Sequence, residues 1–395
     1  MGISVETVKT DAFSMDYVRF GSGKRTFVIL PGLSVQSVMG ARGAVAQAYD
    51  ALTREFTVYL FDRRKELPAA YTVADMADDT AAAMRALGLK DVSLFGASQG
   101  GMIAQCIAIA HPDLIETLIL GSTTARLDAS QFGIFDSWID LAKRGDAEGL
   151  YLAFGEAVYP KAFFEKNRNA FAALAKGVTG GELSRFTLLA ESMRGFDVRD
   201  RLKEIACPVL VLGAKDDAVL APDAAQMYAD AFGGREDCTI CEYDGYGHAA
   251  FDMAPDYRER MLRFLTRPLA LRAHHGMCMR FFEGRGYSEA FTDRMRTVIA
   301  TLSERPQTPV RLTASTDAIC LRCPNNAGGT CTSSEKVRRY DEAVLSLCDL
   351  KAGDELPYAA FAERVKARIL DQGFRETVCG DCEWDGVCTL APHNP

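Results

Sequence analysis

The sequence predicts an α/β fold with a doubly wound, mostly parallel sheet and a helical cap, followed by a small C-terminal, cysteine-rich and mainly helical domain. Short apolar runs alternate with helical patterns up to about residue 265, which predicts the sheet. One of these runs ends in a serine bracketed by glycines. Eight of the twelve cysteines lie beyond residue 277, which predicts the second domain.

Five short runs are apolar at nearly every position, as parallel strands covered on both faces are. They are TFVIL (26–30), TVYLF (57–61), VSLFG (92–96), TLILG (117–121) and PVLVLG (208–213). Between them, apolar residues from Val73 to Leu87 recur at helical spacing, and Gly88 is placed to end that helix.

The strand pattern stops between Thr124 and Arg201, where helical segments rich in aromatic residues take over. We predict a helical cap over about residues 125–200. Most of its rings would form the core of the cap, and a few would line an apolar pocket above the carboxyl edge of the sheet.

A chain of 395 residues is long for a single core, so we expect two domains. Pro268 ends the last helix of the α/β pattern. The predicted domains are therefore residues 1–267 and residues 268–395.

The formal net charge of −8 argues against a nucleic-acid partner, which requires a cationic surface. The N-terminal residues show no secretory signal, and no run of about 18 apolar residues predicts a membrane span. Twelve cysteines without an export signal indicate a reducing compartment, so we expect a cytoplasmic protein whose thiols stay reduced or bind metal.

The stretch LFGASQGG (94–101) places Ser98 between Gly96 and Gly100, directly after an apolar strand and before a helical pattern. Glycine on both sides of a serine is what a sharp, strained strand-to-helix turn requires, because a Cβ would collide with the neighbouring backbone. This context resembles the α/β-hydrolase family over about residues 14–266. The resemblance implies that Ser98 attacks a carbonyl, that a histidine removes its proton, and that an acid orients the histidine.

The histidine can also be found by elimination among five: His111, His248, His274, His275 and His393. His111 ends the helix after the turn, His393 lies in the tail, and the adjacent pair belongs to the cysteine-rich region. His248, in DGYGHAAF before the last helix of the pattern, remains as the catalytic base and resembles the family's histidine loop.

The acid should follow the strand that ends at Gly213, where GAKDDAVLAP offers Asp216 and Asp217. Matching to the family favours Asp216, although spacing alone does not separate the two. Asp128 is an alternative position that some relatives use. The resemblance further implies an oxyanion hole made by the backbone N–H groups of Gln99 and of Leu33 in the LPGLS loop.

These residues predict a serine hydrolase of the carboxylic-ester type that acts on a small-molecule ester, thioester, lactone or related carbonyl substrate with an apolar part. The chemistry of the triad itself needs no cofactor. The alternative is a ligand-binding receptor or redox sensor in which the hydrolase fold binds its ligand without turning it over.

The C-terminal region contains ICLRCPNNAGGTC (319–331) and CGDCEWDGVC (379–388), each a C-x-x-C pair followed by a third cysteine. A C-x-x-C turn places two sulfurs on one side of the backbone, as a tetrahedral ion or a cluster requires. The pairs are too far apart for a usual zinc ribbon, and there are more cysteines than one zinc can use.

The set formed by His274-His275 with Cys278, by GRGYSEAF, by AIC and by CGDCEW with Cys388 resembles a bacterial and archaeal family of unknown function suspected of binding an iron–sulfur cluster. The resemblance covers about residues 270–390 and favours an iron–sulfur cluster, of the 4Fe–4S type, over zinc; a redox partner would accompany it. The predicted ligands are four of Cys320, Cys331, Cys379, Cys382 and Cys388, with Cys278 and Cys323 in reserve.

Overall fold

The computed structural model describes residues 3–220 and 223–390. The chain divides into two compact units, Met1–Leu265 and Thr266–Pro395. Each unit has its own hydrophobic core. The helices that the structure describes are too short or too polar to cross a membrane.

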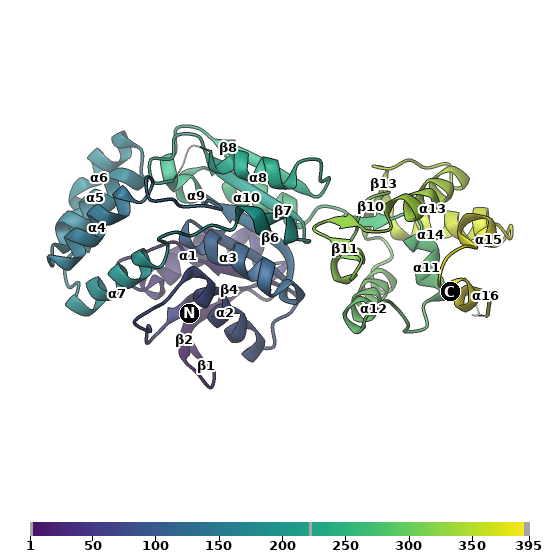
Figure 1. Ribbon diagram of the computed structural model, residues 1–395, viewed down its shortest axis with the longest axis horizontal. Helices are drawn as coiled ribbons and strands as arrows, with labels where there is room; N and C mark the ends of the chain where they lie inside the picture. Colours follow the sequence, from purple (N-terminus) through teal and green to yellow (C-terminus); the bar gives the residue numbers. More distant parts are fainter. Residues whose placement is uncertain (1–2, 221–222, 391–395) are drawn as a thin grey trace. The chain divides into compact units, whose positions relative to one another are not determined.

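The first unit is built on an eight-stranded sheet in the order β1-β2-β4-β3-β5-β6-β7-β8 (Figure 1). The last six strands of this order run parallel, whereas β1 and β2 pair antiparallel at one edge. The strands are β1 (Val5–Lys9), β2 (Ser14–Phe20), β3 (Arg25–Leu30), β4 (Phe56–Arg64), β5 (Val92–Ala97), β6 (Ile115–Gly121), β7 (Val209–Ala214) and β8 (Cys238–Tyr243). The doubly wound, mostly parallel sheet predicted from the apolar runs is confirmed.

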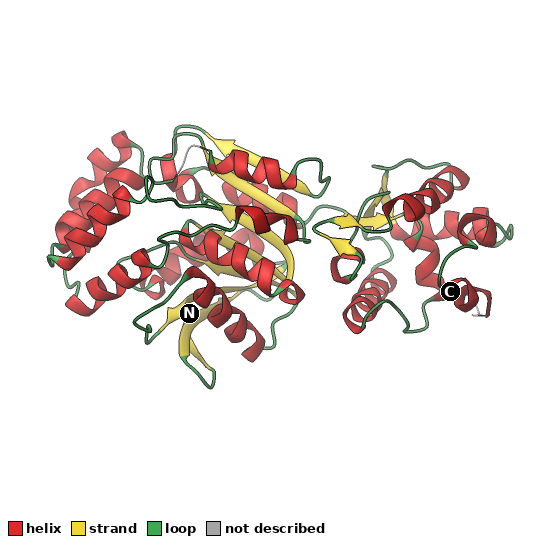
Figure 2. Ribbon diagram, viewed as in Figure 1, coloured by secondary structure: helices red, strands yellow, loops and turns green. Residues whose placement is uncertain are grey.

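Helices follow the strands and cover both faces of the sheet (Figure 2). Every residue of β5 is buried, as expected for a central strand that is covered on both faces. The predicted helix at 73–87 is α2, whose capping box at Thr72 and Asp75 fixes its start and whose end is followed by Gly88 at φ +69°. The helices are α1 (Arg42–Ala48), α2 (Val73–Ala86), α3 (Gln99–Ala110), α8 (Ala224–Phe232), α9 (Ala250–Met253) and α10 (Tyr257–Leu265), with short 3₁₀ turns at Val38–Ala41, Asp50–Leu52, Pro112–Leu114, Arg199–Glu204 and Gly247–Ala249.

Four helices are inserted between β6 and β7, where the cap is predicted (Figure 1). They are α4 (Gly133–Lys143), α5 (Ala147–Val158), α6 (Lys161–Leu174) and α7 (Gly180–Glu191). Their aromatic rings pack against one another, as Trp138 does with Phe154 at 4.7 Å between ring centroids and Phe132 with Phe135 at 5.2 Å. Mutual ring packing therefore forms the core of the insertion.

The second unit combines a three-stranded sheet in the order β13-β10-β9 with a two-stranded hairpin and six α-helices. β9 pairs parallel to β10, and β13 pairs antiparallel to it. The elements are β9 (Leu269–Arg272), α11 (His275–Cys278), a 3₁₀ turn (Met279–Phe281), α12 (Glu289–Glu304), β10 (Pro309–Thr313), a 3₁₀ turn (Cys320–Arg322), β11 (Asn326–Ala327), β12 (Thr330–Cys331), α13 (Ser334–Leu347), β13 (Glu355–Pro357), α14 (Tyr358–Val365), a π-helical turn (Lys366–Leu370), α15 (Arg375–Cys379) and α16 (Asp385–Leu390). The unit is mainly helical, and its small sheet has no counterpart in the sequence prediction.

Candidate active site and cysteine-lined cavity

The turn between β5 and α3 is strained at Ser98, which has φ +52° and ψ −121°. A Cβ at Gly96 would lie 2.2 Å from the carbonyl oxygen of Gly100, and a Cβ at Gly100 would lie 2.1 Å from that of Leu30. Real Cβ atoms do not approach backbone oxygens so closely, so both positions require glycine. These glycines therefore permit the sharp turn, as predicted, because they let its backbone lie very close to neighbouring backbone.

The strained serine is held by the end of the neighbouring strand. The Ser98 N–H donates to the Gly121 carbonyl at 2.9 Å, and the Thr123 hydroxyl donates to the Ser98 carbonyl at 2.7 Å. Such contacts are needed to maintain a non-glycine residue at positive φ.

The loop after β3 passes directly against Ser98. A Cβ at Gly32 would lie 3.1 Å from the Ser98 Cβ. Leu33 follows in this loop and is buried, and Gln99 begins α3. Among the described residues, no hydrogen bond from the backbone N–H of Leu33 or Gln99 is recorded.

A buried arginine that the sequence analysis did not select supports this loop. Arg63, at the end of β4, donates from Nη2 to the Pro31 carbonyl at 2.7 Å and to the Gln99 side-chain oxygen at 3.4 Å. Burial lowers the pKa of Arg63 to about 10, and the charge of Asp62 counters this effect. The sequence signal for Arg63 was a cationic residue directly after a predicted buried strand, in FDRRKEL.

His248 pairs with Asp217, at 2.8 Å between Nδ1 and Oδ2, and both side chains are buried. The other oxygen of Asp217 accepts from the N–H groups of Val219 and Leu220 at 2.8 and 3.0 Å. Burial by itself would raise the pKa of the Asp217 carboxyl, but the charge and hydrogen bond of His248 and the two N–H groups lower it overall. This carboxylate is thus held ionised against the imidazole.

The preference for Asp216 as the acid is wrong. Asp216 accepts a hydrogen bond from the Gly247 N–H at 3.0 Å, so its carboxylate contacts the backbone of the loop that carries His248. Asp128 is engaged elsewhere, because hydrogen bonds from Ser130 and Arg126 lower its pKa to about 2. Asp217 is the carboxylate in contact with the imidazole.

Ser98, Asp217 and His248 follow β5, β7 and β8, which belong to one parallel set of strands. The carboxyl ends of parallel strands share one edge of the sheet, where ligand sites of α/β folds form. Of the other histidines, His111 pairs with Asp78 at 2.8 Å, and His393 lies outside the described residues.

A small cavity lies beside the loop after β3. It has a volume of about 10 Å³, room for about one water molecule, and its cap residues are Arg185 and Leu189. Its other lining residues are mostly polar: Pro31, Gly32, Ser34, Val35, Gln36, Ser37, Asp62, Arg63 and Gln99.

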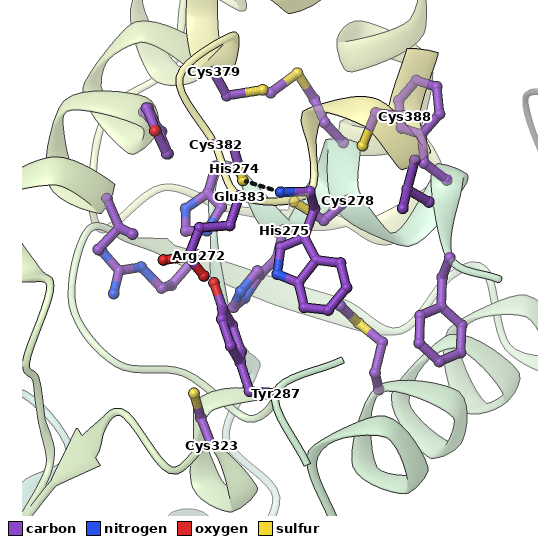
Figure 3. A pocket seen from close by; sticks show the side chains of 18 of the residues that line it. Arg272, His274, His275, Cys278, Tyr287, Cys323, Cys379, Cys382, Glu383 and Cys388 are labelled. Carbon is purple, nitrogen blue, oxygen red and sulfur yellow. Dashed lines mark hydrogen bonds between the residues drawn. The ribbon is translucent and has the colours of Figure 1, made fainter. Parts of the chain in front are cut away.

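In the second unit, the predicted metal-ligating residues line one cavity of about 150 Å³ (Figure 3). Both adjacent histidines, His274 and His275, also line it. The cysteines of the lining are Cys278, Cys320, Cys323, Cys331, Cys379, Cys382 and Cys388. Cys348 is instead buried in the hydrophobic core of the unit.

Four of these thiols interact with one another. Burial raises the pKa of Cys278 well above its usual value, and the thiolates of Cys379, Cys382 and Cys388 raise it further. Burial raises the pKa of Cys379 to about 11, again with a contribution from Cys382. We call Cys278, Cys379, Cys382 and Cys388 the four-cysteine set. Burial and neighbouring sulfur charges disfavour the thiolate form here, and a bound cation would favour it.

Each histidine is fixed by a buried carboxylate. His274 Nδ1 lies 2.7 Å from Asp341 Oδ1, and His275 Nδ1 lies 2.7 Å from Asp317 Oδ2. Both carboxylates are fully buried, and the two imidazole centroids are 4.4 Å apart. The ligand atoms of His275, Asp317 and Cys320 lie within 4.8 Å of one another. This cluster and the cysteine-rich lining form a candidate metal site.

Two features define the fold class of the first unit. It has a parallel α/β sheet, and it carries a serine at a strained strand-to-helix turn. The chain belongs to the alpha/beta hydrolase family, whose model matches residues 27–264. The model of a second family, described as "Protein of unknown function (DUF1284)", matches residues 286–388. Both family resemblances predicted from the sequence are confirmed.

Two similar proteins match about three-fifths of the chain. "Putative carbamate hydrolase RutD" of Agrobacterium fabrum is 29% identical over 252 residues, which are 61% of this chain and 95% of that protein. A protein of the same name from Rhizobium rhizogenes is 27% identical over 241 residues, 58% of this chain and 91% of that protein.

Two solved structures share the fold. The enol-lactonase from Burkholderia xenovorans LB400 has a TM-score of 0.57 at 18% identity and covers 66% of this chain and 100% of its own. The esterase EaEST from Exiguobacterium antarcticum has a TM-score of 0.55 at 21% identity and covers 68% of this chain and 100% of its own.

Proposed function

We propose that the first unit hydrolyses a carbonyl substrate through Ser98, His248 and Asp217. The observation that carries the proposal is the buried Asp217–His248 pair in a fold that also presents Ser98 at a strained turn. Esters, thioesters and lactones are the proposed substrate class. The relatives named as carbamate hydrolases add carbamates to this class.

In the proposed reaction, the Ser98 hydroxyl attacks the carbonyl carbon and its proton passes to His248 Nε2. Asp217 holds Nδ1–H and stabilises the imidazolium that forms. The N–H groups of Leu33 and Gln99 bind the oxyanion, and His248 then protonates the leaving group. Water hydrolyses the acyl-serine by the reverse sequence of proton transfers.

Two parts of the site bear on the substrate group next to the carbonyl. Asp62, Arg63 and Arg185 line the small cavity beside the loop after β3 and favour a polar group there. An apolar part of the substrate would instead have to contact the cap. Comparing acyl chains of increasing length with carbamates of equal length tests this distinction.

Labelling with a fluorophosphonate tests the nucleophile. Wild-type protein and Ser93→Ala should be labelled, whereas Ser98→Ala should not. Ser93 is a matched control because it lies in the same strand and is fully buried. Labelling of Ser98→Ala at the wild-type rate would exclude Ser98 as the nucleophile.

We also propose that the four-cysteine set holds an iron–sulfur cluster. Four thiolates are the usual ligands of such a cluster. All four cysteines line the same cavity, which has the volume for a group larger than a single ion.

Two residues next to the four-cysteine set would stabilise the negative charge of a thiolate-bound cluster. The Trp384 N–H donates to the Cys382 sulfur at 3.5 Å, a contact that stabilises cluster sulfurs. Arg375 lines the cavity; burial lowers its pKa, but the hydrogen bond and charge of Asp385, with smaller contributions from Cys379 and Cys388, raise it overall. Protein prepared without oxygen should absorb near about 400 nm and contain iron and acid-labile sulfide. Protein that contains neither iron nor sulfide would refute the cluster.

A further inference from the structure

The seven cavity cysteines fall into two groups. The four-cysteine set comes from α11, α15, α16 and the turn between the last two. The other three thiols belong to one continuous segment, Cys320 to Cys331. Cys323 lies apart from Cys379, Cys382 and Cys388 in the close view of the cavity (Figure 3). The remaining three thiols need not share the cluster of the four-cysteine set.

His275 has the orientation of a metal ligand. Its Nδ1 is bound to Asp317, which fixes the ring and leaves Nε2 as the free ligand position. Among the described residues, no hydrogen bond to Nε2 is recorded, and the ring lines the cavity. Histidine ligands in metal sites commonly have such a carboxylate behind them.

Asp317 itself is occupied by other donors. Oδ1 accepts from the N–H groups of Ile319 and Cys320, both at 2.9 Å. Oδ2 accepts from the Arg272 N–H and from His275, both at 2.7 Å. One fully buried carboxylate therefore fixes the imidazole and the turn that carries the Cys320 thiol. Asp317 is a positioning residue for both, and its oxygens have no need of a metal.

The same segment places two further thiols on the lining of the cavity. The Cys323 N–H donates to the Cys320 carbonyl at 3.0 Å, which closes the C-x-x-C turn. Asn326 donates from its side chain to the same carbonyl at 3.0 Å and pairs with Cys331 across the β11–β12 hairpin. Cys323 and Cys331 both line the same cavity as His275 and Cys320.

We infer that the second unit holds a second metal centre, a single zinc ion bound by His275 Nε2 and by the thiolates of Cys320, Cys323 and Cys331. Three thiolates and one imidazole form one of the usual ligand sets of structural zinc. A ring nitrogen of His275 lies within 4.8 Å of the Cys320 sulfur, so one residue of each ligand type is already close to the other. This centre is separate from the proposed cluster and from the serine chemistry.

Metal analysis of the full chain, prepared without oxygen and with zinc and iron supplied, tests the inference. Wild-type protein should contain about one zinc in addition to the iron of the cluster. His275→Gln and Cys320→Ser should lose the zinc and keep the absorption near about 400 nm. The double variant Cys379→Ser/Cys382→Ser should lose the iron and keep the zinc.

His274→Gln is the matched control, because His274 is the neighbouring imidazole with its own buried carboxylate, Asp341. It should keep both metals. Zinc retained in both His275→Gln and Cys320→Ser overturns the inference. So does loss of both metals in every cysteine variant, which would indicate one shared centre.

X-ray absorption at the zinc edge of the wild-type protein does not depend on whether a variant folds. One nitrogen and three sulfur ligands are expected. Four sulfur ligands, or wild-type protein without zinc, overturn the inference. The proposed cluster is judged separately from the iron and sulfide content.

Discussion

His248 Nδ1 lies 2.8 Å from Asp217 Oδ2, while the adjacent Asp216 accepts from the backbone N–H of Gly247. Two neighbouring carboxylates thus have different partners in one loop. One contacts the imidazole itself, and the other contacts the chain that carries the imidazole.

The first prediction compares these two carboxylates. Asp217→Asn should lower kcat by about 10³- to 10⁴-fold, because the amide no longer fixes the productive tautomer of His248. Asp216→Asn keeps an oxygen that can accept from Gly247, so its kcat should fall by less than about 10-fold. Ester hydrolysis under saturating substrate measures both. Equal losses in the two variants would contradict the assignment of Asp217.

The second prediction concerns stability in acid. The folded pKa of Asp217 is lowered, so its contribution to stability is present above the unfolded value of about 4 and is lost as the pH falls through the folded value. Asp217→Asn should therefore be less stable than wild type at pH 7, by about 1–2 kcal/mol. The difference should shrink below about pH 4.

Urea denaturation of the full chain at several pH values measures this difference. Asp216→Asn controls for the loss of a neighbouring carboxylate. A difference between wild type and Asp217→Asn that is constant from neutral to acid pH would contradict the prediction.

The third prediction concerns Arg63 as a positioning residue. Its guanidinium joins the Pro31 carbonyl to the Gln99 side chain, next to both proposed oxyanion donors. Both hydrogen bonds come from Nη2, at the far end of a planar guanidinium, and the shorter, more strongly hydrated lysine side chain does not place a nitrogen there in the same way. Arg63→Lys should lower kcat by about 10- to 100-fold with little change in KM, because misplaced donors weaken transition-state binding.

Arg64→Lys is the matched control for Arg63, since Arg64 is adjacent but pairs with Asp79 at 3.3 Å. It should leave kcat within about 3-fold of wild type. A rise in KM alone in Arg63→Lys would indicate a role in substrate binding and not in oxyanion geometry.

The fourth prediction concerns the glycines of the serine turn. A Cβ at Gly100 would lie 2.1 Å from the Leu30 carbonyl oxygen, whereas a Cβ at Gly43 in α1 would meet nothing within 4 Å. Gly100→Ala should destabilise the protein by about 3 kcal/mol or more, because backbone must move. Gly43→Ala should stabilise it by up to about 1 kcal/mol. Denaturant titration of both variants measures these changes in stability. Equal effects of the two substitutions would contradict the prediction.

The sequence predicted the central strands because their residues are apolar on both faces, and it predicted the serine turn because backbone contacts there exclude any side chain. Asp216 and Asp217 could not be separated, since the N–H groups of Val219 and Leu220 orient Asp217 and lie in a loop without a regular pattern. The antiparallel β1 and β2 mix polar with apolar residues and are only partly buried, so they lack the continuous apolar run of the central strands.

The spacing of the cysteines in the sequence could not predict how they group in the structure either. Cys278 lies about a hundred residues before Cys379, and only the tertiary fold places both thiols on one cavity. Local spacing did predict the two C-x-x-C turns, because those contacts form within a few residues.

The last prediction concerns metal removal. Thiolate ligands that converge on one cavity make metal binding part of the folding energy of the second unit. A chelator under reducing conditions should therefore increase amide hydrogen exchange across residues 266–390. The first unit has its own core and a separate set of contacts, so fluorophosphonate labelling of Ser98 should continue at the untreated rate. The variant Cys379→Ser/Cys382→Ser should show part of the increased exchange without chelator. Loss of Ser98 labelling in parallel with the metal would show that the hydrolase chemistry depends on the cysteine-rich unit.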